Sequence, residues 1–212
     1  MYAGVIQDNP PADLVARYYA APELTNPSAI PASAIKAIVD LRNRNLSQVD
    51  EDGVDFDLDY RQPVGAGQLG LGLSGSYIFS VNQRVTETSP TVDVVGTVGN
   101  PNHLRMRGRI NWTQGPWSTN IAVNYIDGYQ NQIPIPAQSI KSWTTTDLQL
   151  AWQAPPDAGP LADLRVALSV SNLFDKDPPF AEIRSVTSAT GYDGEKASPI
   201  GRLIALELVR SW

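Results

Sequence analysis

Residues 164–179 read Leu-Arg-Val-Ala-Leu-Ser-Val-Ser-Asn-Leu-Phe-Asp-Lys-Asp-Pro-Pro, and this stretch decides the fold class. Its first half alternates between apolar and polar or small residues, which is the period of a β-strand. The apolar positions are Leu164, Val166, Leu168 and Val170. Arg165 lies on the opposite face, and a strand with one apolar face and one charged face is typical of a sheet between lipid and water. The stretch therefore predicts a strand of a membrane β-barrel.

The same alternation recurs along most of the chain. Besides residues 164–171, it is found in residues 43–62, 67–81, 104–112, 117–125, 145–152 and 200–212. Short turns at residues 63–66, 114–116 and 154–161 alternate with longer polar loops at residues 82–103, 129–140 and 174–199. Barrels of outer membranes have tight periplasmic turns and longer extracellular loops. The sequence thus predicts an all-β, antiparallel, up-and-down transmembrane barrel segment of about seven strands.

The N-terminal part has a different character. Residues 1–34 are rich in Pro, Ala and Asn, with a short helix expected at Ala12–Tyr19. We expect Ser33 to cap a second helical turn that runs through Ile38. This predicts two regions, a loop with short helices over residues 1–42 and a barrel part over residues 43–212.

Composition excludes several classes of function. The 212 residues contain no cysteine, so neither a disulfide framework nor a thiolate metal site is expected. A net charge of -6 disfavours a nucleic-acid surface, which needs clustered Lys and Arg. There is no run of about 20 apolar residues that would span a membrane as a helix. The N-terminus lacks a basic region followed by an apolar stretch, so an exported protein of this sequence is expected either to be a piece of a longer one or to come from a gene that has lost its front end.

Three arginines form the most prominent charged group in the sequence. Arg105, Arg107 and Arg109 share one strand face, and each would cost ~2–4 kcal/mol in the middle of a membrane. They are therefore expected to face the lumen. Guanidiniums in that position could hold a plug or guide an anionic ligand through bidentate contacts. The alternative is a solvated wall balanced by nearby acids.

Those acids are Asp55, Asp57 and Asp59, which share a strand face. Alternate side chains of a strand stand nearly 7 Å apart, with the rise per residue about 3.4 Å. One cation cannot reach all three at the Ca²⁺–oxygen distance of about 2.4 Å. We therefore predict no metal site, and count the three aspartates with the lumen-facing residues.

No residue pattern indicates an enzyme. His103, the single histidine, is expected to be exposed in a loop, with no second ligand for zinc. Asp175, Lys176 and Asp177 precede two prolines, which favours a structural turn over a catalytic acid pair. No glycine-rich phosphate loop and no nucleophile elbow is present. Neither catalytic residues nor a cofactor are predicted.

Aromatic residues cluster toward the strand ends. Trp112, Trp117, Trp152 and Trp212 lie toward the short turns, and Tyr77, Phe79, Tyr125 and Trp143 lie toward the long loops. Two such groups predict the girdles that barrels place at the two membrane interfaces.

Motifs in the second half resemble the C-terminus of TonB-dependent outer-membrane receptors. The resemblance lies in the Asn172-Leu173-Phe174-Asp175-Lys176-Asp177-Pro178-Pro179 run, Gly191-Tyr192-Asp193, Gly201-Arg202 and the aromatic last residue. Upstream, Asn45-Leu46-Ser47, Gly53-Val54-Asp55-Phe56-Asp57 and Tyr60 resemble the family's "N, then G-V-D/E, then Y" strand. Trp212, with Leu206 and Leu208 on its face, resembles the C-terminal signal read by the barrel assembly machinery, although Arg210 departs from that pattern.

The resemblance implies an outer-membrane transporter for active uptake of a scarce nutrient such as a siderophore, a vitamin or a saccharide. It also implies an N-terminal plug, the remaining strands of a barrel of about 22, outer-membrane lipid and the TonB complex as partners. Seven strands are about a third of such a barrel, so we expect the chain not to transport alone. A self-standing small β-barrel with a structural or adhesive role is the alternative, and it would need an eighth strand before residue 43. A soluble carbohydrate-binding sandwich is a third possibility.

Overall fold

The structure of the chain is a computed structural model that describes residues 6–26, 28–39, 48–84, 89–184 and 189–210. The chain separates into two compact units, one of Met1–Asp50 with Asn82–Asp93 and one of Glu51–Val81 with Val94–Trp212. Among the described residues, no helix has the length and apolar character needed to cross a membrane.

The first unit contains a small helical element closed by two short strands. Strand β1 (Ile6–Asp8) pairs antiparallel with β2 (Ala37–Val39), and α1 (Ala12–Tyr19) and the 3₁₀ turn η1 (Ala32–Ala34) lie between them in the chain. The helix predicted at Ala12–Tyr19 is confirmed. Asp13 stands in its first turn and Arg17 in its last, as the helix dipole favours.

The predicted helical turn through Ile38 is wrong. The 3₁₀ turn ends at Ala34, and Ile38 pairs with Gln7 in the two-stranded sheet. Ile38 and Val39 favour extended backbone. The register with residues more than twenty positions away then decides their conformation, which local capping signals cannot reveal.

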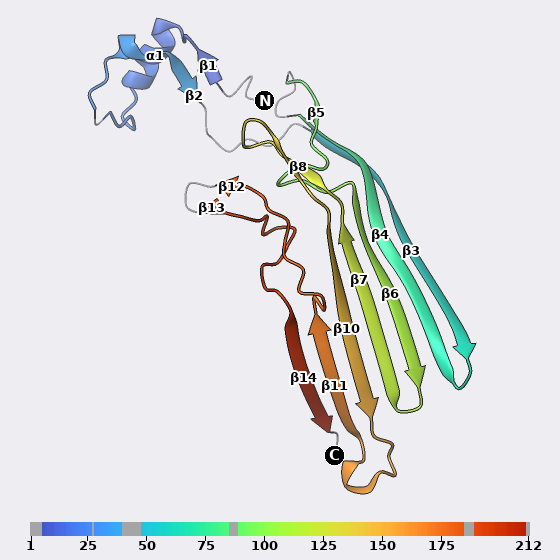
Figure 1. The fold of residues 1–212 in the computed structure, drawn as a ribbon. Helices are drawn as coiled ribbons and strands as arrows, with labels where there is room; N and C mark the ends of the chain where they lie inside the picture. The colour runs from blue at the N-terminus through green and yellow to red at the C-terminus, as the bar shows by residue number, and fades with distance from the viewer. Residues whose placement is uncertain (1–5, 27, 40–47, 85–88, 185–188, 211–212) are drawn as a thin grey trace. The chain divides into compact units, whose positions relative to one another are not determined.

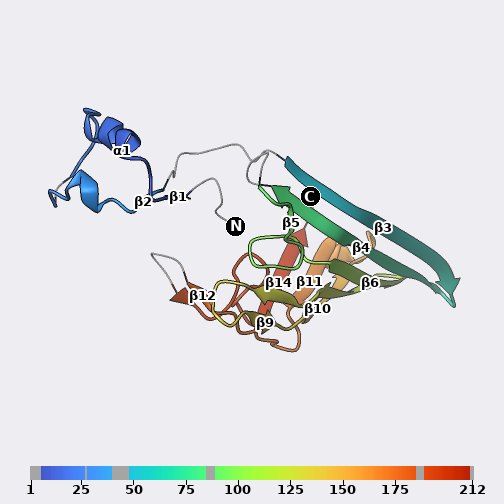
Figure 2. The same cartoon turned by 90° about the horizontal axis from the view of Figure 1, so that it is seen from above.

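Seven long strands form one antiparallel sheet among the described residues (Figure 1). In chain order they are β3 (Gln48–Val64), β4 (Gly67–Arg84), β6 (Leu104–Gln114), β7 (Trp117–Ile126), β10 (Trp143–Gln153), β11 (Leu164–Ser171) and β14 (Leu203–Arg210). Each pairs with its neighbours along the chain, and the short β5 (Val92–Asp93) pairs with β4. The sheet is open, with β3 and β14 at its edges (Figure 2). This confirms the predicted up-and-down β-barrel segment of about seven strands.

Glycines make the tight turns at one end of the sheet. Gly65 and Gly115 both have positive φ, at the first position of the two-residue connections β3–β4 and β6–β7. This conformation suits glycine and matches the twist of the two strands it joins. The β10–β11 connection is longer and contains the 3₁₀ turn η2 (Gly159–Leu161).

The long connections carry short strands of their own at the other end of the sheet (Figure 1). They are β8 (Tyr129–Asn131) paired with β9 (Gln138–Ile140), and β12 (Ile183–Arg184) paired with β13 (Ala189–Thr190). Tyr129, Ile140 and Ala181 form a buried cluster among these connections. The side-chain amide of Asn131, fully buried, donates to the Glu182 carbonyl at 2.9 Å. The loops that the sequence marks as long are thus packed against one another.

A turn after β11 is built by its polar side chains. The Asn172 side chain accepts a hydrogen bond from the Lys176 amide (2.9 Å) and donates to the Lys176 carbonyl (3.0 Å). The Asp175 carboxylate accepts the amide of Arg202 at 2.7 Å, close to the start of β14. Asp175 therefore orients the last strand, which matches the structural role predicted for this segment.

Candidate functional site

The two faces of the sheet differ in chemistry, as the strand registers show. Arg105, Arg107 and Arg109 lie opposite Ser76, Ser74 and Gly72 on β4 and opposite Ile126, Asn124 and Ala122 on β7. On the other face, Leu71, Ile110, Ile121 and Leu148 are successive cross-strand neighbours. Small or uncharged residues on both sides leave space around the three arginines. We name the face that carries the three arginines the polar face, and the opposite one the apolar face.

Arg109 forms an ion pair with Asp59 at 3.7 Å. The two residues lie on β6 and β3, with β4 between them. Gly72 faces Arg109 in the register, and a Cβ built there would stand 3.0 Å from the Arg109 Nε and 3.2 Å from the Asp59 carboxylate. The missing side chain of Gly72 thus lets the pair cross a whole strand.

The other sequence-predicted charges of this face are not brought together in the same way. Asp55 and Asp57 share the strand with Asp59 and are exposed. Within the described residues, neither Arg105 nor Arg107 makes an ion pair. Nor do three His, Asp or Glu side chains of the described residues converge as a possible metal site.

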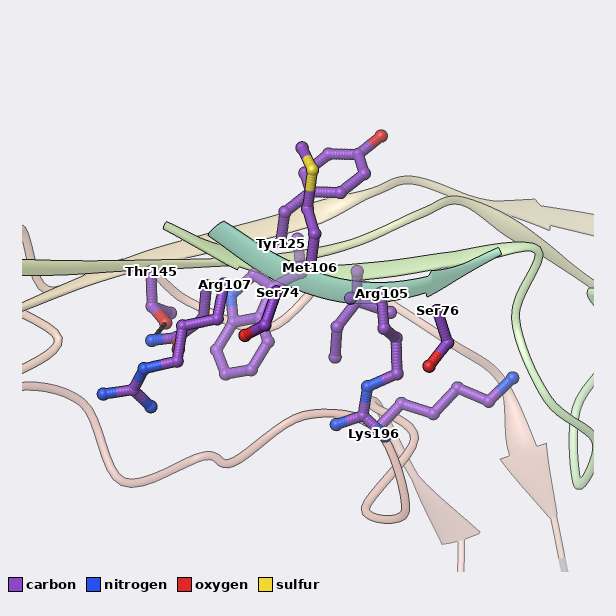
Figure 3. Close-up of a pocket in the computed structure, with 12 residues that line it drawn as sticks. Ser74, Ser76, Arg105, Met106, Arg107, Tyr125, Thr145 and Lys196 are labelled. Carbon is purple, nitrogen blue, oxygen red and sulfur yellow. Dashed lines mark hydrogen bonds between the residues drawn. The ribbon is translucent and has the colours of Figure 1, made fainter. Parts of the chain in front are cut away.

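Arg105 and Arg107 line a cleft of about 600 Å³. Figure 3 shows both arginines on the same side of the sheet as Ser74, Ser76 and Thr145, with Lys196 on that side next to Arg105 and with Met106 and Tyr125 on the opposite side. The complete lining is Ser74, Gly75, Ser76, Arg105, Met106, Arg107, Asn124, Tyr125, Ile126, Trp143, Thr145 and Lys196. Four strands and one loop therefore build the cleft.

Lys196 comes from the loop before β14 and is half-buried. Its ammonium donates to the Thr97 carbonyl at 3.0 Å and lies 3.9 Å from the centre of the Tyr129 ring. Burial lowers the pKa of Lys196, and Arg105 acts in the same direction, while Asp193 and Glu195 oppose the shift. The loop thus places a third cationic residue at the edge of the cleft, with its ammonium held by Thr97 and Tyr129.

Tyr129 and Asp193 fix this loop. The Tyr129 hydroxyl donates to the Asp193 carboxylate at 3.0 Å, and both residues are buried. Burial and the neighbouring carboxylate raise the pKa of Tyr129 far above its usual value of 10.0. The Asp193 carbonyl also accepts the amides of Lys196 and Ala197. A tight turn anchored on Asp193 therefore positions the Lys196 side chain.

Trp143 forms another part of the wall, at the long-loop end of β10, as predicted. The register places it opposite Ile126, on the polar face with Thr145 and Asp147, so it does not belong to the apolar aromatic group expected near the long loops. Its indole nitrogen donates to the Asp177 carbonyl at 3.0 Å. A second hollow of about 410 Å³ lies on its loop side and is lined by residues 192 and 194–199.

The predicted interface aromatics lie on the apolar face. Trp152 stands opposite Trp117, with ring centres 6.5 Å apart, and Trp112 lies opposite Leu69 near the same short turns. Tyr77 and Tyr125 stand near the long-loop end of the same face. Their role at a membrane interface stays a prediction.

The last strand presents Leu206 and Leu208 on the apolar face, opposite Leu168 and Val166. Both side chains are exposed, at 66% and 65%. Trp212 and the Asn45-Leu46-Ser47 motif lie outside the described residues.

Sequence reasoning missed several residues of the cleft. Lys196 gave no signal of its own, because its neighbours in the sheet are far away in the chain. Counting by two from Thr145 would have placed Trp143 on the polar face. His103 was expected to be exposed, but it is half-buried and hydrogen-bonds through Nδ1 to the Ile78 carbonyl at 3.0 Å.

A sequence model of one protein family, described as "TonB dependent receptor-like, beta-barrel", matches residues 10–173. That match covers more than half of the chain. No curated protein and no solved structure matches the chain significantly.

Proposed function

The chain belongs to the TonB-dependent receptor-like β-barrel family, and from this membership we propose that it forms part of the wall of an outer-membrane receptor. The family consists of outer-membrane transporters and receptors and is not enzymatic. We propose that the receptor takes up a scarce nutrient, such as a siderophore, a vitamin or a saccharide, at the expense of the proton gradient.

The single observation that carries this proposal is the two-faced sheet. One face is apolar across neighbouring strands and largely exposed, with Leu58, Ile110 and Leu206 at 63%, 46% and 66%. An exposed apolar surface that continues over several strands marks contact with lipid or a partner. The other face carries the arginines and aspartates, which suits a water-filled lumen.

The aromatic residues support the same orientation. Trp112, Trp117 and Trp152 near the short turns would mark one membrane interface, and Tyr77 and Tyr125 near the long loops the other. In this orientation the packed long connections would lie outside the cell. The short turns would then face the periplasm.

The open sheet requires further strands. In the described residues, β3 and β14 each have one strand neighbour, and unpaired backbone groups in lipid cost several kcal/mol each. We propose that remaining strands of a barrel of about 22 complete the wall and that a plug fills the lumen. The plug would contact lumen-facing residues such as Arg109 and Asp59, and couple to the TonB complex.

The alternative of a self-standing small barrel loses its main support. It would need an eighth long strand before residue 43, and the described part of that region forms the separate two-stranded sheet β1–β2. We also propose that Leu206, Leu208 and Trp212 form the signal for the barrel assembly machinery. Trp212→Ala should then lower the amount of assembled protein without changing its synthesis.

Cysteine labelling tests the orientation, because the 212 residues contain no native cysteine. Leu73 and Ser74 are adjacent on β4 and lie on opposite faces. In outer membranes of the native host, a water-soluble maleimide should react with Ser74→Cys and not with Leu73→Cys. Both should react after denaturation. Equal reaction of the two in intact membranes would contradict the proposal.

Uptake is tested separately in cells that lack the chain and in complemented cells. Accumulation of a radiolabelled ferric siderophore, cobalamin or maltodextrin should depend on the chain, and a protonophore should abolish it. No chain-dependent difference for any of the three would argue against a role in nutrient uptake.

A further inference from the structure

The cleft on the polar face carries charge of one sign only. Its lining includes Arg105, Arg107 and Lys196, and no Asp or Glu. Three cations held around one hollow repel one another, and an anion bound between them would relieve that repulsion. The cleft is therefore suited to a negatively charged occupant.

Two other arginines of the same face already have acidic partners. Arg109 pairs with Asp59 at 3.7 Å, and Arg165 pairs with Glu207 at 3.1 Å. Arg105 and Arg107 make no ion pair within the described residues, and Ser76 and Ser74 stand opposite them on β4. Arg109 and Arg165, outside the cleft, are thus paired with acids, whereas the two arginines inside it make no ion pair within the described residues.

The loop holds the third cation in a defined place. Thr97 and Tyr129 position the ammonium of Lys196, as described above. The acids that face Lys196 are Asp193 and Glu195. The Asp193 carboxylate is already engaged by the Tyr129 hydroxyl and the Glu195 amide. Neither acid lines the cleft.

The rest of the lining supplies neutral contacts. Ser74, Ser76 and Thr145 offer hydroxyl groups, and Trp143 offers an aromatic wall that its hydrogen bond to Asp177 holds in place. A volume of about 600 Å³ lies within the usual range for small-molecule sites. Arg105 and Arg107 are two residues apart on one strand, about 7 Å, which suits two separate anionic groups.

We propose that this cleft binds a small organic anion with two or more carboxylate or phosphate groups, which Arg105, Arg107 and Lys196 hold against Trp143 (Figure 3). Guanidinium contacts to carboxylate or phosphate are bidentate and charge-assisted. The proposal rests on the proposed function, because it places the cleft on the lumen side near the long loops. It makes the nutrient of this receptor, or part of it, an anion.

Calorimetry on the full chain in detergent micelles provides the first test, with citrate and pyrophosphate as probes. Triethyl citrate, which has the same skeleton without the charges, is the matched control ligand. We expect heat of binding for one or both anions and none for the triester. Binding should weaken as salt rises, because salt screens exposed charges. Equal binding of citrate and its triester, or binding of neither anion, would overturn the proposal.

Variants locate the site. The double substitution Arg105→Gln with Arg107→Gln should weaken anion binding about tenfold or more, and Lys196→Gln should weaken it further. Arg165→Gln removes one positive charge of the same face, but from an existing ion pair outside the cleft. It should bind as the wild type does. Unchanged affinity of the double variant would overturn the proposal.

Chemical footprinting tests the site in the wild-type chain, so its result does not depend on whether a variant folds. Phenylglyoxal should modify Arg105 and Arg107 more slowly when citrate or pyrophosphate is present, as mass spectrometry of peptides reports. Arg17, exposed in the first unit, serves as the internal control and should react at the same rate. Equal protection of Arg17, or no protection of the two cleft arginines, would contradict the proposal.

The outcomes separate this inference from the proposed function. Loss of anion binding with correct cysteine labelling of the two faces would reject the anion site alone. If the chain binds anions but its apolar face reacts freely with maleimide, the anion site stands and the proposed role as part of an outer-membrane barrel wall is rejected.

Discussion

Arg109 of β6 and Asp59 of β3 form an ion pair of 3.7 Å across the intervening strand β4. The pair is possible because Gly72 places no side chain between them. Both partners are partly exposed, with 37% and 58% of their side-chain surface accessible. The pair therefore balances charge on the polar face more than it stabilises the fold.

A double-mutant cycle should measure this contribution. With Asp59→Asn, Arg109→Gln and the double variant, we expect a coupling free energy of about 0.2–1 kcal/mol, typical of exposed pairs. Urea unfolding in liposomes at low and high salt gives the value, and the coupling should shrink at high salt. A coupling above about 3 kcal/mol would show that the pair behaves as a buried one.

Two glycines of the apolar face should respond differently to alanine. A Cβ at Gly75 would lie 2.5 Å from the Arg105 carbonyl and 2.7 Å from the Phe56 ring, whereas a Cβ at Gly108 would meet nothing within 4 Å. Gly75→Ala should therefore lower the free energy of unfolding by about 1–3 kcal/mol through overpacking. Gly108→Ala should leave it unchanged or raise it slightly. Heat-modified migration on gels ranks the two, and the opposite order would refute the packing argument.

The hydrogen bond between Tyr129 and Asp193 should make the stability of the long connections depend on pH. The folded state raises the pKa of Tyr129, so this stabilisation is fully present below pH 10.0 and is lost as the pH rises toward the folded pKa. The stability difference between wild type and Tyr129→Phe should therefore shrink above about pH 10, by at most about 1.4 kcal/mol for each pH unit.

The rate of proteolysis of the loop at residues 189–199 measures this stability difference between wild type and Tyr129→Phe. Tyr125→Phe is the control. The Tyr125 hydroxyl contacts Asp127 at 3.2 Å and is half-buried. Its loss should leave the pH dependence intact. A difference that grows above pH 10 would contradict the role of Tyr129.

Neighbouring positions on β10 should differ in their tolerance of charge. Leu150 lies on the apolar face and Gln149 on the polar face. Leu150→Arg should cost about 2–4 kcal/mol of insertion free energy, because a guanidinium in mid-membrane is poorly solvated. Gln149→Arg should assemble normally. Liposome insertion assays measure both, and equal yields of folded protein would argue against lipid on the Leu150 side.

The strands and their two faces could be predicted from the sequence because a period of two is a local property. Leu148 and Leu150 against Asp147 and Gln149, for instance, needed no knowledge of any neighbour. The pairing of β1 with β2 could not be predicted in this way. It joins Ile6 to Val39 through a long-range register that overrides the local helical signal before Ile38.

The sequence by itself determined the fold class, the turns and the side of the sheet that each strand residue faces, since backbone geometry alone sets these features. Only the tertiary structure decided which charges are neutralised. Asp59 reaches Arg109 because the register puts a glycine between them. Lys196 lines the same cleft as Arg105 and Arg107 because Tyr129 and Asp193 hold its loop in place. Such contacts depend on packing between segments far apart in the chain, where local patterns carry no information.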